Sequence, residues 1–199
     1  SNLASSLVSV LYNFRLMALA GENGVAAYGV IMYVNFIFAA IFMGYAIGSA
    51  PVVGYHYGAE HHDELKNLLN KSLRLVAAAA LVLTALSELL ARPLTQIFVG
   101  YDPELWAFTC HGFQLYSLSF LFSGFNVFGS SFFTALNNGL VSAGISFSRT
   151  LLFQVAAVLL LPLVLGVDGI WLAITVAELL CLLVTAGCLV KLRSRYHYA

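Results

Sequence analysis

Long apolar runs separated by short polar breaks constrain this chain more than any other feature. The runs cover residues 3–20, 25–54, 73–91, 105–136, 141–165 and 170–190. A helix needs about 20 mostly apolar residues to cross a bilayer, and a helix satisfies its own backbone hydrogen bonds in lipid. The sequence therefore predicts an all-α polytopic membrane protein, a single lobe formed by a six-transmembrane-helix bundle, with no room for a second folded domain.

Composition excludes several classes of function. Hydrophobic residues make up 61% of the chain and charged residues 9%, and the mean hydropathy is +0.90, so an ordinary soluble enzyme domain is excluded. The formal net charge of +0 gives no footprint for nucleic acid. No nucleophile elbow, phosphate loop, dinucleotide fingerprint or zinc-spaced Cys and His set occurs. We therefore expect no enzyme activity, no cofactor and no nucleic-acid partner.

One polar stretch, residues 55–74, interrupts the apolar pattern for longer than a tight turn. Its Leu65, Leu68 and Leu69 recur at helical spacing, which predicts a short amphipathic helix at the membrane interface. Its three histidines at positions 56, 61 and 62 are more typical of a solvated loop than of a metal site, because no fixed ligand spacing accompanies them. We therefore expect no metal site.

Positive charge is unevenly divided between the two ends of the predicted bundle. With an even number of spans both termini share one side, and Arg92 is the only Lys or Arg in the loops of the other side. The side of the termini carries Lys66, Lys71, Arg74, Lys191, Arg193 and Arg195. Because basic loops are retained in the cytoplasm, we expect both termini to be cytoplasmic, with the chain in the cell membrane.

Charged residues inside the apolar runs are candidates for function, because a charge in hydrocarbon costs a few kcal/mol and usually faces a cavity or a partner. Arg149 and Glu178 are the deepest, each roughly 12 Å from a span boundary at the helical rise. Their expected depths differ by about 10 Å, so a direct salt bridge is marginal, and a water-mediated pair or separate supporting roles are equal alternatives. Glu88 is expected to pair with Arg92 one turn away.

Amides and aromatic residues at membrane depth form a second set of candidates. They are Asn13, Asn35, Gln114 and Asn126, accompanied by Tyr33 and Phe125. Buried amides hold helices together in many membrane bundles, whereas apolar walls with a few polar groups also form cavities for amphipathic ligands. The residues alone leave both interpretations open.

Several short stretches occur in an order that resembles one transporter family. The second run contains residues 26–35 (AAYGVIMYVN), 44–51 (GYAIGSAP) and 54–59 (GYHYGA). Later stretches are residues 132–137 (FFTALN), 148–150 (SRT), 166–173 (GVDGIWLA) and 177–178 (AE). In combination they resemble the C-terminal six-helix half of multidrug and toxic compound extrusion (MATE) transporters, over essentially the whole chain.

The resemblance implies one lobe of a twelve-helix fold that exports drugs or metabolites in exchange for Na⁺ or H⁺ by alternating access. It implies an amphipathic or cationic small-molecule substrate, surrounding membrane lipids, and a partner that is a missing N-terminal lobe or a second copy. Some members carry coupling carboxylates on the first and fourth helices of this lobe, where this chain has Asn13, Arg15 and Asn126. The coupling carboxylate is therefore expected in the N-terminal lobe, and a fragment of a longer chain is favoured over a natural half transporter.

Two alternatives remain beside the efflux antiporter. A lipid-linked oligosaccharide flippase of the same superfamily needs basic residues to meet a pyrophosphate, and the spans offer only Arg15 and Arg149. A non-transporting membrane scaffold would need no cavity residues at all. Under the antiporter hypothesis, Asn35, Asn126, Tyr33 and Phe125 line the cavity, and Arg149 and Glu178 support it.

Overall fold

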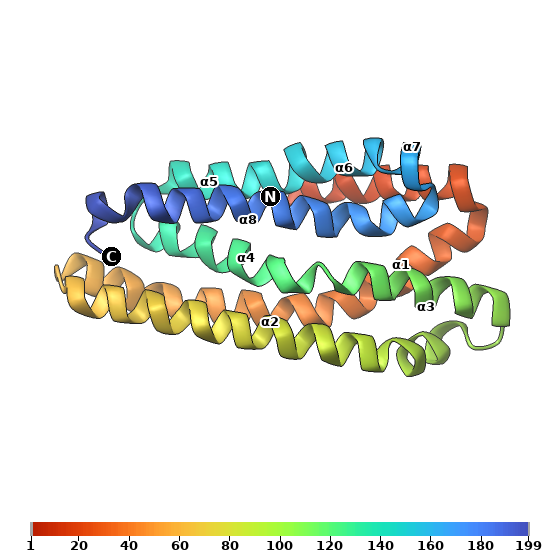
Figure 1. Ribbon diagram of the computed structural model, residues 1–199, viewed down its shortest axis with the longest axis horizontal. Coiled ribbons are helices and arrows are strands. Elements are labelled where there is room, and N and C mark those ends of the chain that lie inside the picture. Colours follow the sequence, from red (N-terminus) through yellow and green to blue (C-terminus); the bar gives the residue numbers. More distant parts are fainter. Residues whose placement is uncertain (1, 199) are drawn as a thin grey trace.

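The computed structural model describes residues 2–198, which form a bundle of helices without strands. In chain order the elements are α1 (Asn2–Gly58), α2 (His62–Val99), α3 (Pro103–Ser117), α4 (Phe120–Ala135), α5 (Gly139–Phe147), the π-helix η1 (Ser148–Phe153), α6 (Gln154–Leu160), α7 (Pro162–Leu165) and α8 (Val167–Tyr196). The rods lie side by side along one long axis (Figure 1). The all-α fold class is confirmed.

Helix α1 consists of two arms that meet at Gly21. This residue has φ 62° and ψ −150°, outside helical geometry, in a region that glycine enters readily because it lacks a Cβ. The chain reverses there, and the two arms run back past each other (Figure 1). The polar turn expected at residues 21–24 is therefore a break at one residue, and helix continues through the rest.

The expected loop at residues 55–74 is much shorter in the structure. Helix α1 continues to Gly58, and α2 begins at His62. Leu65 and Leu69 are buried in a core cluster with Phe133. The leucine spacing was interpreted correctly as helical, but the apolar face packs inward against the lobe.

The next connection is also shorter than expected, because α2 continues through Pro93 to Val99. Val99 and Leu105 pack together with Val30 in a small cluster, which holds the helix beyond the proline. Helix α3 begins directly after Asp102, whose carboxylate accepts hydrogen bonds from the backbone N–H groups of Glu104 and Leu105, at 3.0 and 3.2 Å.

Each of the two following apolar runs is divided into several elements. Helices α3 and α4 meet at a bend of 46°. Residues 141–165 fall in α5, η1, α6 and α7, and residue 161 separates the last two. By length and composition, four helices of residues 2–198 are able to span a membrane, or five if the bent pair counts as one span. Because that count takes α1 with its two arms as one helix, the division into six spans stays a prediction.

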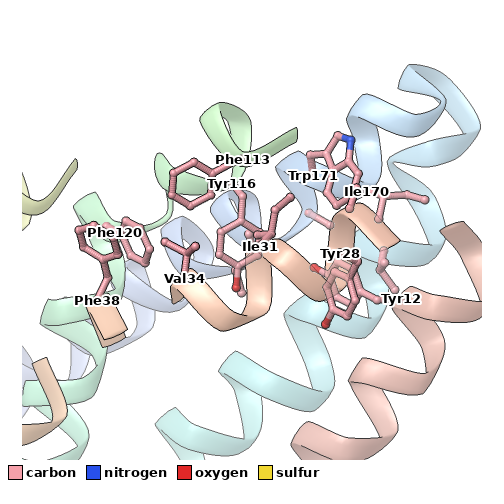
Figure 2. Packing of buried hydrophobic residues seen from close by; sticks show 14 of the residues in the cluster. Tyr12, Tyr28, Ile31, Val34, Phe38, Phe113, Tyr116, Phe120, Ile170 and Trp171 are labelled. Carbon is pink, nitrogen blue, oxygen red and sulfur yellow. The ribbon is translucent and has the colours of Figure 1, made fainter. Parts of the chain in front are cut away.

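Aromatic side chains dominate the larger core cluster (Figure 2). The rings of Tyr12 and Tyr28 stack with centroids 5.2 Å apart, which joins the two arms of α1. The fully buried Trp171 of α8 fits against Gly112 of α3, where an added Cβ would come within 2.7 Å of the indole. The absence of a side chain at Gly112 therefore sets how closely α3 and α8 approach.

The two ends of the bundle differ in charge. The α1–α2 turn, the α4–α5 turn and the C-terminus lie at one end, whereas the reversal within α1 and the α2–α3 and α7–α8 turns lie at the other (Figure 1). The basic segments at residues 66–74 and 191–195 are in the first turns of α2 and the last turns of α8, at the same end, whereas Arg92 is in the last two turns of α2, which lead to the opposite end. The N-terminus lies about halfway along the bundle (Figure 1). The cytoplasmic placement of the termini stays a prediction.

The last described residues fold back onto the same end. Tyr198 is buried against Phe132, with ring centroids 5.3 Å apart, and its hydroxyl donates to the carbonyl of Leu189 at 2.9 Å. Burial raises the pKa of Tyr198 to about 12, because the apolar surroundings disfavour the phenolate. The hydroxyl of Tyr196 accepts a hydrogen bond from the Asn138 amide at 2.8 Å. These contacts fix the end of α8 to α4 and to the α4–α5 turn.

Candidate functional site: a buried ion pair between η1 and α8

Arg149 and Glu178 form a direct ion pair inside the lobe. The Arg149 Nε donates to Glu178 Oε1 at 2.7 Å. The Glu178 side chain is 1% exposed and that of Arg149 is 33% exposed. The carboxylate is therefore sealed in the lobe, while part of the guanidinium remains accessible.

The contact is more direct than uniform helical rise suggested. Between the two residues the chain passes through the wide turns of η1, the break at residue 161 and the reversal at Gly166, which has φ 59°. A rise of about 1.5 Å per residue applies only to continuous α-helix, so these irregular segments shift the depths of the two residues. The long side chain of Arg149 spans the remaining distance from its backbone to the Glu178 carboxylate.

An amide and a hydroxyl complete the surroundings of Glu178. The Asn126 Nδ2 of α4 donates to Glu178 Oε2 at 2.8 Å and to the Glu178 backbone carbonyl, also at 2.8 Å. The Asn126 Oδ1 in turn accepts from the Thr185 hydroxyl at 2.8 Å. Both carboxylate oxygens thus have a donor, which a buried charge requires if it is to be tolerated.

A separate group of hydroxyls lies between α4 and α5. The Ser130 hydroxyl lies 2.9 Å from those of Ser142 and Ser146, and the Thr134 hydroxyl lies 2.7 Å from that of Ser142. Asn126, Ser130 and Thr134 are spaced four residues apart and so share one face of α4. Along this face, Asn126 contacts α8, whereas Ser130 and Thr134 contact α5.

Of the predicted cavity residues, only Asn126 joins the ion pair. Asn13 donates to the carbonyl of Ser9 on its own helix at 2.9 Å, and Gln114 is half-buried on α3. Asn35 is half-buried on the second arm of α1. Tyr33 is exposed and stacks on Phe98 at a centroid distance of 6.5 Å, while Phe125 packs against the second core cluster. The structure therefore brings Arg149, Glu178 and Asn126 together and leaves the others dispersed.

The remaining charged groups of the apolar runs have local partners. Glu88 accepts a hydrogen bond from the Ser117 hydroxyl, and the ion pairs formed by residues 2–198 do not include the expected contact between Glu88 and Arg92. That expectation was wrong, because α3 supplies a nearer donor. Arg15 donates to the carbonyl of Leu159 at 2.8 Å.

Helical spacing from Glu178 marks two further residues of α8 near the ion pair. Thr185 lies seven residues after Glu178, and the buried Cys181 lies three residues after it, so all three share one face of α8. A search for polar residues at helical spacing from each intramembrane charge would have found Thr185. Helical spacing from the intramembrane charges does not single out Tyr12. Its buried hydroxyl lies near the Gln154 side chain but makes no hydrogen bond of ordinary geometry.

The chemistry of the site is that of a fixed charge pair. Neither a nucleophile with an adjacent base nor, in the part of the chain that the structure describes, a group of three or more His, Cys, Asp or Glu placed to hold a metal accompanies the pair. A guanidinium with an accessible edge, backed by a carboxylate, offers hydrogen-bond donors and a positive charge at depth in the bundle. Such groups bind or gate, and do not by themselves catalyse bond cleavage.

The sequence of this chain matches a known family of proteins. The sequence profile of the family described as MatE matches residues 1–159. The chain belongs to the MatE family. Members of this family are transporters and not enzymes. Comparison with curated proteins yields no significant sequence match.

Solved structures agree with this membership. An outward-facing multidrug resistance MATE family transporter of the MOP superfamily shares 20% identity at a TM-score of 0.87, over 98% of this chain and 43% of that one. The inward-facing form has the same identity and TM-score, with 98% and 44% covered. A MOP superfamily transporter from Pyrococcus furiosus, described as having a binding pocket of reverse polarity, gives 19% and 0.86, with 98% and 43% covered.

The chain matches only part of each of these longer transporters. It spans less than half the length of each of these MATE structures, yet almost all of it is matched. It therefore has the architecture of one half of that fold. Sequence identities of 20% or less show a shared fold but do not identify the substrate or the coupling ion.

Proposed function

We propose that this chain is the C-terminal lobe of a cation-coupled multidrug or metabolite efflux antiporter that works by alternating access. Family membership and the half-length match to transporters in both outward-facing and inward-facing forms support this proposal. The partner is the N-terminal lobe of a longer chain or a second copy. The chain works in the cell membrane, with both termini in the cytoplasm.

The buried network of Arg149, Glu178 and Asn126 is the observation that carries the proposal. A scaffold has no need for a charge pair inside the bundle, because burying it costs several kcal/mol per ion before the attraction is counted. Paired ionisable groups at membrane depth are typical of substrate and ion pathways. The exposed share of Arg149 is available to line such a pathway.

The roles proposed for the other candidates follow from their placement. Asn35, Tyr33, Phe125, Asn13 and Gln114 are proposed as walls of a cavity that takes an amphipathic or cationic molecule. Asn126 differs from them, because Glu178 and Thr185 engage both ends of its amide. We assign Asn126 to holding Glu178 in place, and not to direct substrate contact.

The coupling ion, Na⁺ or H⁺, is proposed to bind outside this lobe. Both oxygens of Glu178 already have donors within 2.8 Å, so a cation would have to displace the guanidinium. Arg149 thus acts as a permanent counter-charge. A carboxylate of the N-terminal lobe remains the proposed coupling group.

Dye accumulation tests the proposal. The native polypeptide that contains this chain is expressed in cells that lack their own efflux pumps, and intracellular ethidium is followed by fluorescence. We expect wild type to lower ethidium and Glu178→Gln to abolish this effect. Asp63→Asn, an exposed carboxylate in the first turn of α2, is the matched control and should export normally.

The same assay separates the alternatives. A protonophore or replacement of Na⁺ by choline should stop export, and whichever does so identifies the coupling ion. If wild type leaves ethidium unchanged while its membrane level is normal, the multidrug proposal is contradicted. A band of 21.5 kDa on an immunoblot of the native membrane would indicate a second copy as the partner lobe, whereas a longer product would contain both lobes.

A further inference from the structure

An apolar groove opens on the outside of the bundle where α5 and α8 run side by side. Its volume is about 430 Å³, and the lining residues are Val141 of α5 and Val184, Gly187, Cys188, Lys191 and Leu192 of α8. The two helices lead to the end of the bundle that holds the C-terminus (Figure 1). The groove is distinct from the ion pair, and none of its residues takes part in that network.

The α8 wall of the groove is a single helix face. Val184, Gly187, Cys188 and Lys191 follow one another at steps of three, one and three residues, which places them in one stripe. Gly187 has no side chain, so the groove is open at the middle of the stripe. A Cβ built at Gly187 would meet no atom within 4 Å. A larger side chain at Gly187 would therefore project into open groove and not into the core.

The groove has one charged group, and that group lies at its outer end. Lys191 directly follows the predicted sixth span, so we expect it at the level where lipid headgroups begin, and Val184 lies about 10 Å farther along the helix toward the membrane centre. No acidic residue lines the groove. Its walls therefore complement a molecule with an apolar chain and an anionic head.

We propose that this groove binds an anionic phospholipid, with one acyl chain between α5 and α8 and the phosphate against Lys191. Basic pockets between helices at the cytoplasmic face are known to favour anionic headgroups over neutral ones. A soluble amphiphile would have to compete with the lipid that surrounds this face of the bundle. The phospholipid is therefore the occupant that both the chemistry and the location favour.

The bound lipid would lie against α8, which carries Glu178, and α5, which leads directly into the π-helix that carries Arg149. Helix α5 continues directly into η1, which holds Arg149, and Val184 is adjacent to Thr185 of the Glu178 network. A chain lodged between α5 and α8 supports their spacing next to that network. The membrane composition would in this way influence the site without any contact with it.

Cys188 provides a reporter within the groove. It is partly exposed, whereas Cys110 and Cys181 are buried and serve as internal references. The native polypeptide is placed in nanodiscs of pure phosphatidylcholine or of phosphatidylcholine with phosphatidylglycerol. Alkylation of each cysteine by N-ethylmaleimide is then followed by peptide mass spectrometry. We expect Cys188 to react several-fold more slowly in the nanodiscs that contain phosphatidylglycerol.

Three variants decide whether the groove causes this protection. Gly187→Leu fills the groove and should make the Cys188 rate the same in both membranes. Lys191→Gln should reduce the protection by about fivefold, the factor that corresponds to roughly 1 kcal/mol per basic residue near an anionic surface. Arg193→Gln, a neighbouring exposed charge that does not line the groove, is the control and should leave the protection unchanged.

Other outcomes overturn the proposal. Equal Cys188 rates in both membranes for wild type would show that no anionic lipid is preferred there. An equal loss of protection in Arg193→Gln and Lys191→Gln would indicate general attraction to the basic tail in place of a groove site. Persistent protection in Gly187→Leu would place the lipid elsewhere.

Discussion

Within residues 2–198, two side-chain contacts of nearly equal length lie in opposite surroundings: an Arg–Glu ion pair and a His–Asp contact that is an ion pair only while the histidine is protonated. Arg149 and Glu178 meet at 2.7 Å with the carboxylate sealed in the lobe, whereas His111 and Asp168 meet at 2.9 Å with side chains 56% and 53% exposed. An exposed pair contributes about 0–1 kcal/mol, because water screens the attraction and the side chains lose freedom. The two contacts have similar distances, but we expect the stability of the fold to depend much more on the buried one.

The comparison shows which contact the fold depends on. If the histidine is lost, Asp168 is solvated at the bundle end and little changes. If Arg149 is lost, a carboxylate that is 1% exposed remains without its counter-charge. The consequences of each change can be measured by thermal unfolding of the native polypeptide in one detergent.

The largest effect is expected from Arg149→Ala. We expect a loss of about 3–5 kcal/mol in the free energy of unfolding, the cost of leaving a buried charge unpaired. Glu178→Gln should cost less, because the guanidinium that remains is 33% exposed and reaches water. A smaller loss for Arg149→Ala than for Glu178→Gln would contradict the assigned burial.

A double variant measures how strongly the two charges are coupled. Arg149→Met combined with Glu178→Leu should be more stable than the sum of the single losses by about 2–3 kcal/mol, the upper part of the range for residues in one network. This variant should nevertheless export no ethidium. Additive losses would show that the two side chains act independently.

Asn126→Ala removes the amide that donates to Glu178 Oε2 and to the Glu178 carbonyl. We expect a loss of about 1.5–3 kcal/mol, because the acceptor is charged and buried. Ser123→Ala, a half-buried residue on the same helix for which the structure shows no side-chain hydrogen bond, is the control and should change stability little. Equal losses in the two variants would mean that helix packing, and not the hydrogen bond, is being measured.

The smallest effect is expected from His111→Ala. The loss should stay below about 1 kcal/mol and should shrink further at high salt, as for other exposed pairs. The measurement is the midpoint of thermal unfolding at low and at high salt. A loss comparable to that of Arg149→Ala would remove the distinction between the two pairs.

Several local features followed directly from the sequence. The Asp102 cap was predictable because Asp, Pro and Glu at the start of a helix satisfy the first free N–H groups in a known way. The turn at residues 137–139 was predictable for a similar reason: Asn137 has φ 59°, and Asn138 accepts from the backbone of Val141. Both depend on interactions within a few residues.

Other features were missed because they depend on distant contacts. The spacing of the leucines in residues 65–69 predicted a helix but not the residues that bury its apolar face. Those residues include Val53 and Phe133, which come from other parts of the chain. The apolar run that ends at residue 91 did not predict that the helix continues through Pro93 to Val99, because packing of Val99 on Val30 is invisible in the local sequence. Glu88 was assigned to Arg92 because Ser117 of α3 cannot be placed beside it without the fold.

Local properties of the sequence, namely hydrophobic length and helix capping, were enough to show that this chain is a helical membrane protein, where α3 and α5 begin, and which charges lie deep in the apolar runs. Only the folded chain shows that Arg149 contacts Glu178, that Asn126 and Thr185 complete their network, and that α5 and α8 leave a groove between them. These contacts depend on the π-helical turns of η1 and the reversal at Gly166, which change helix depth and rotation by amounts that a residue count does not contain.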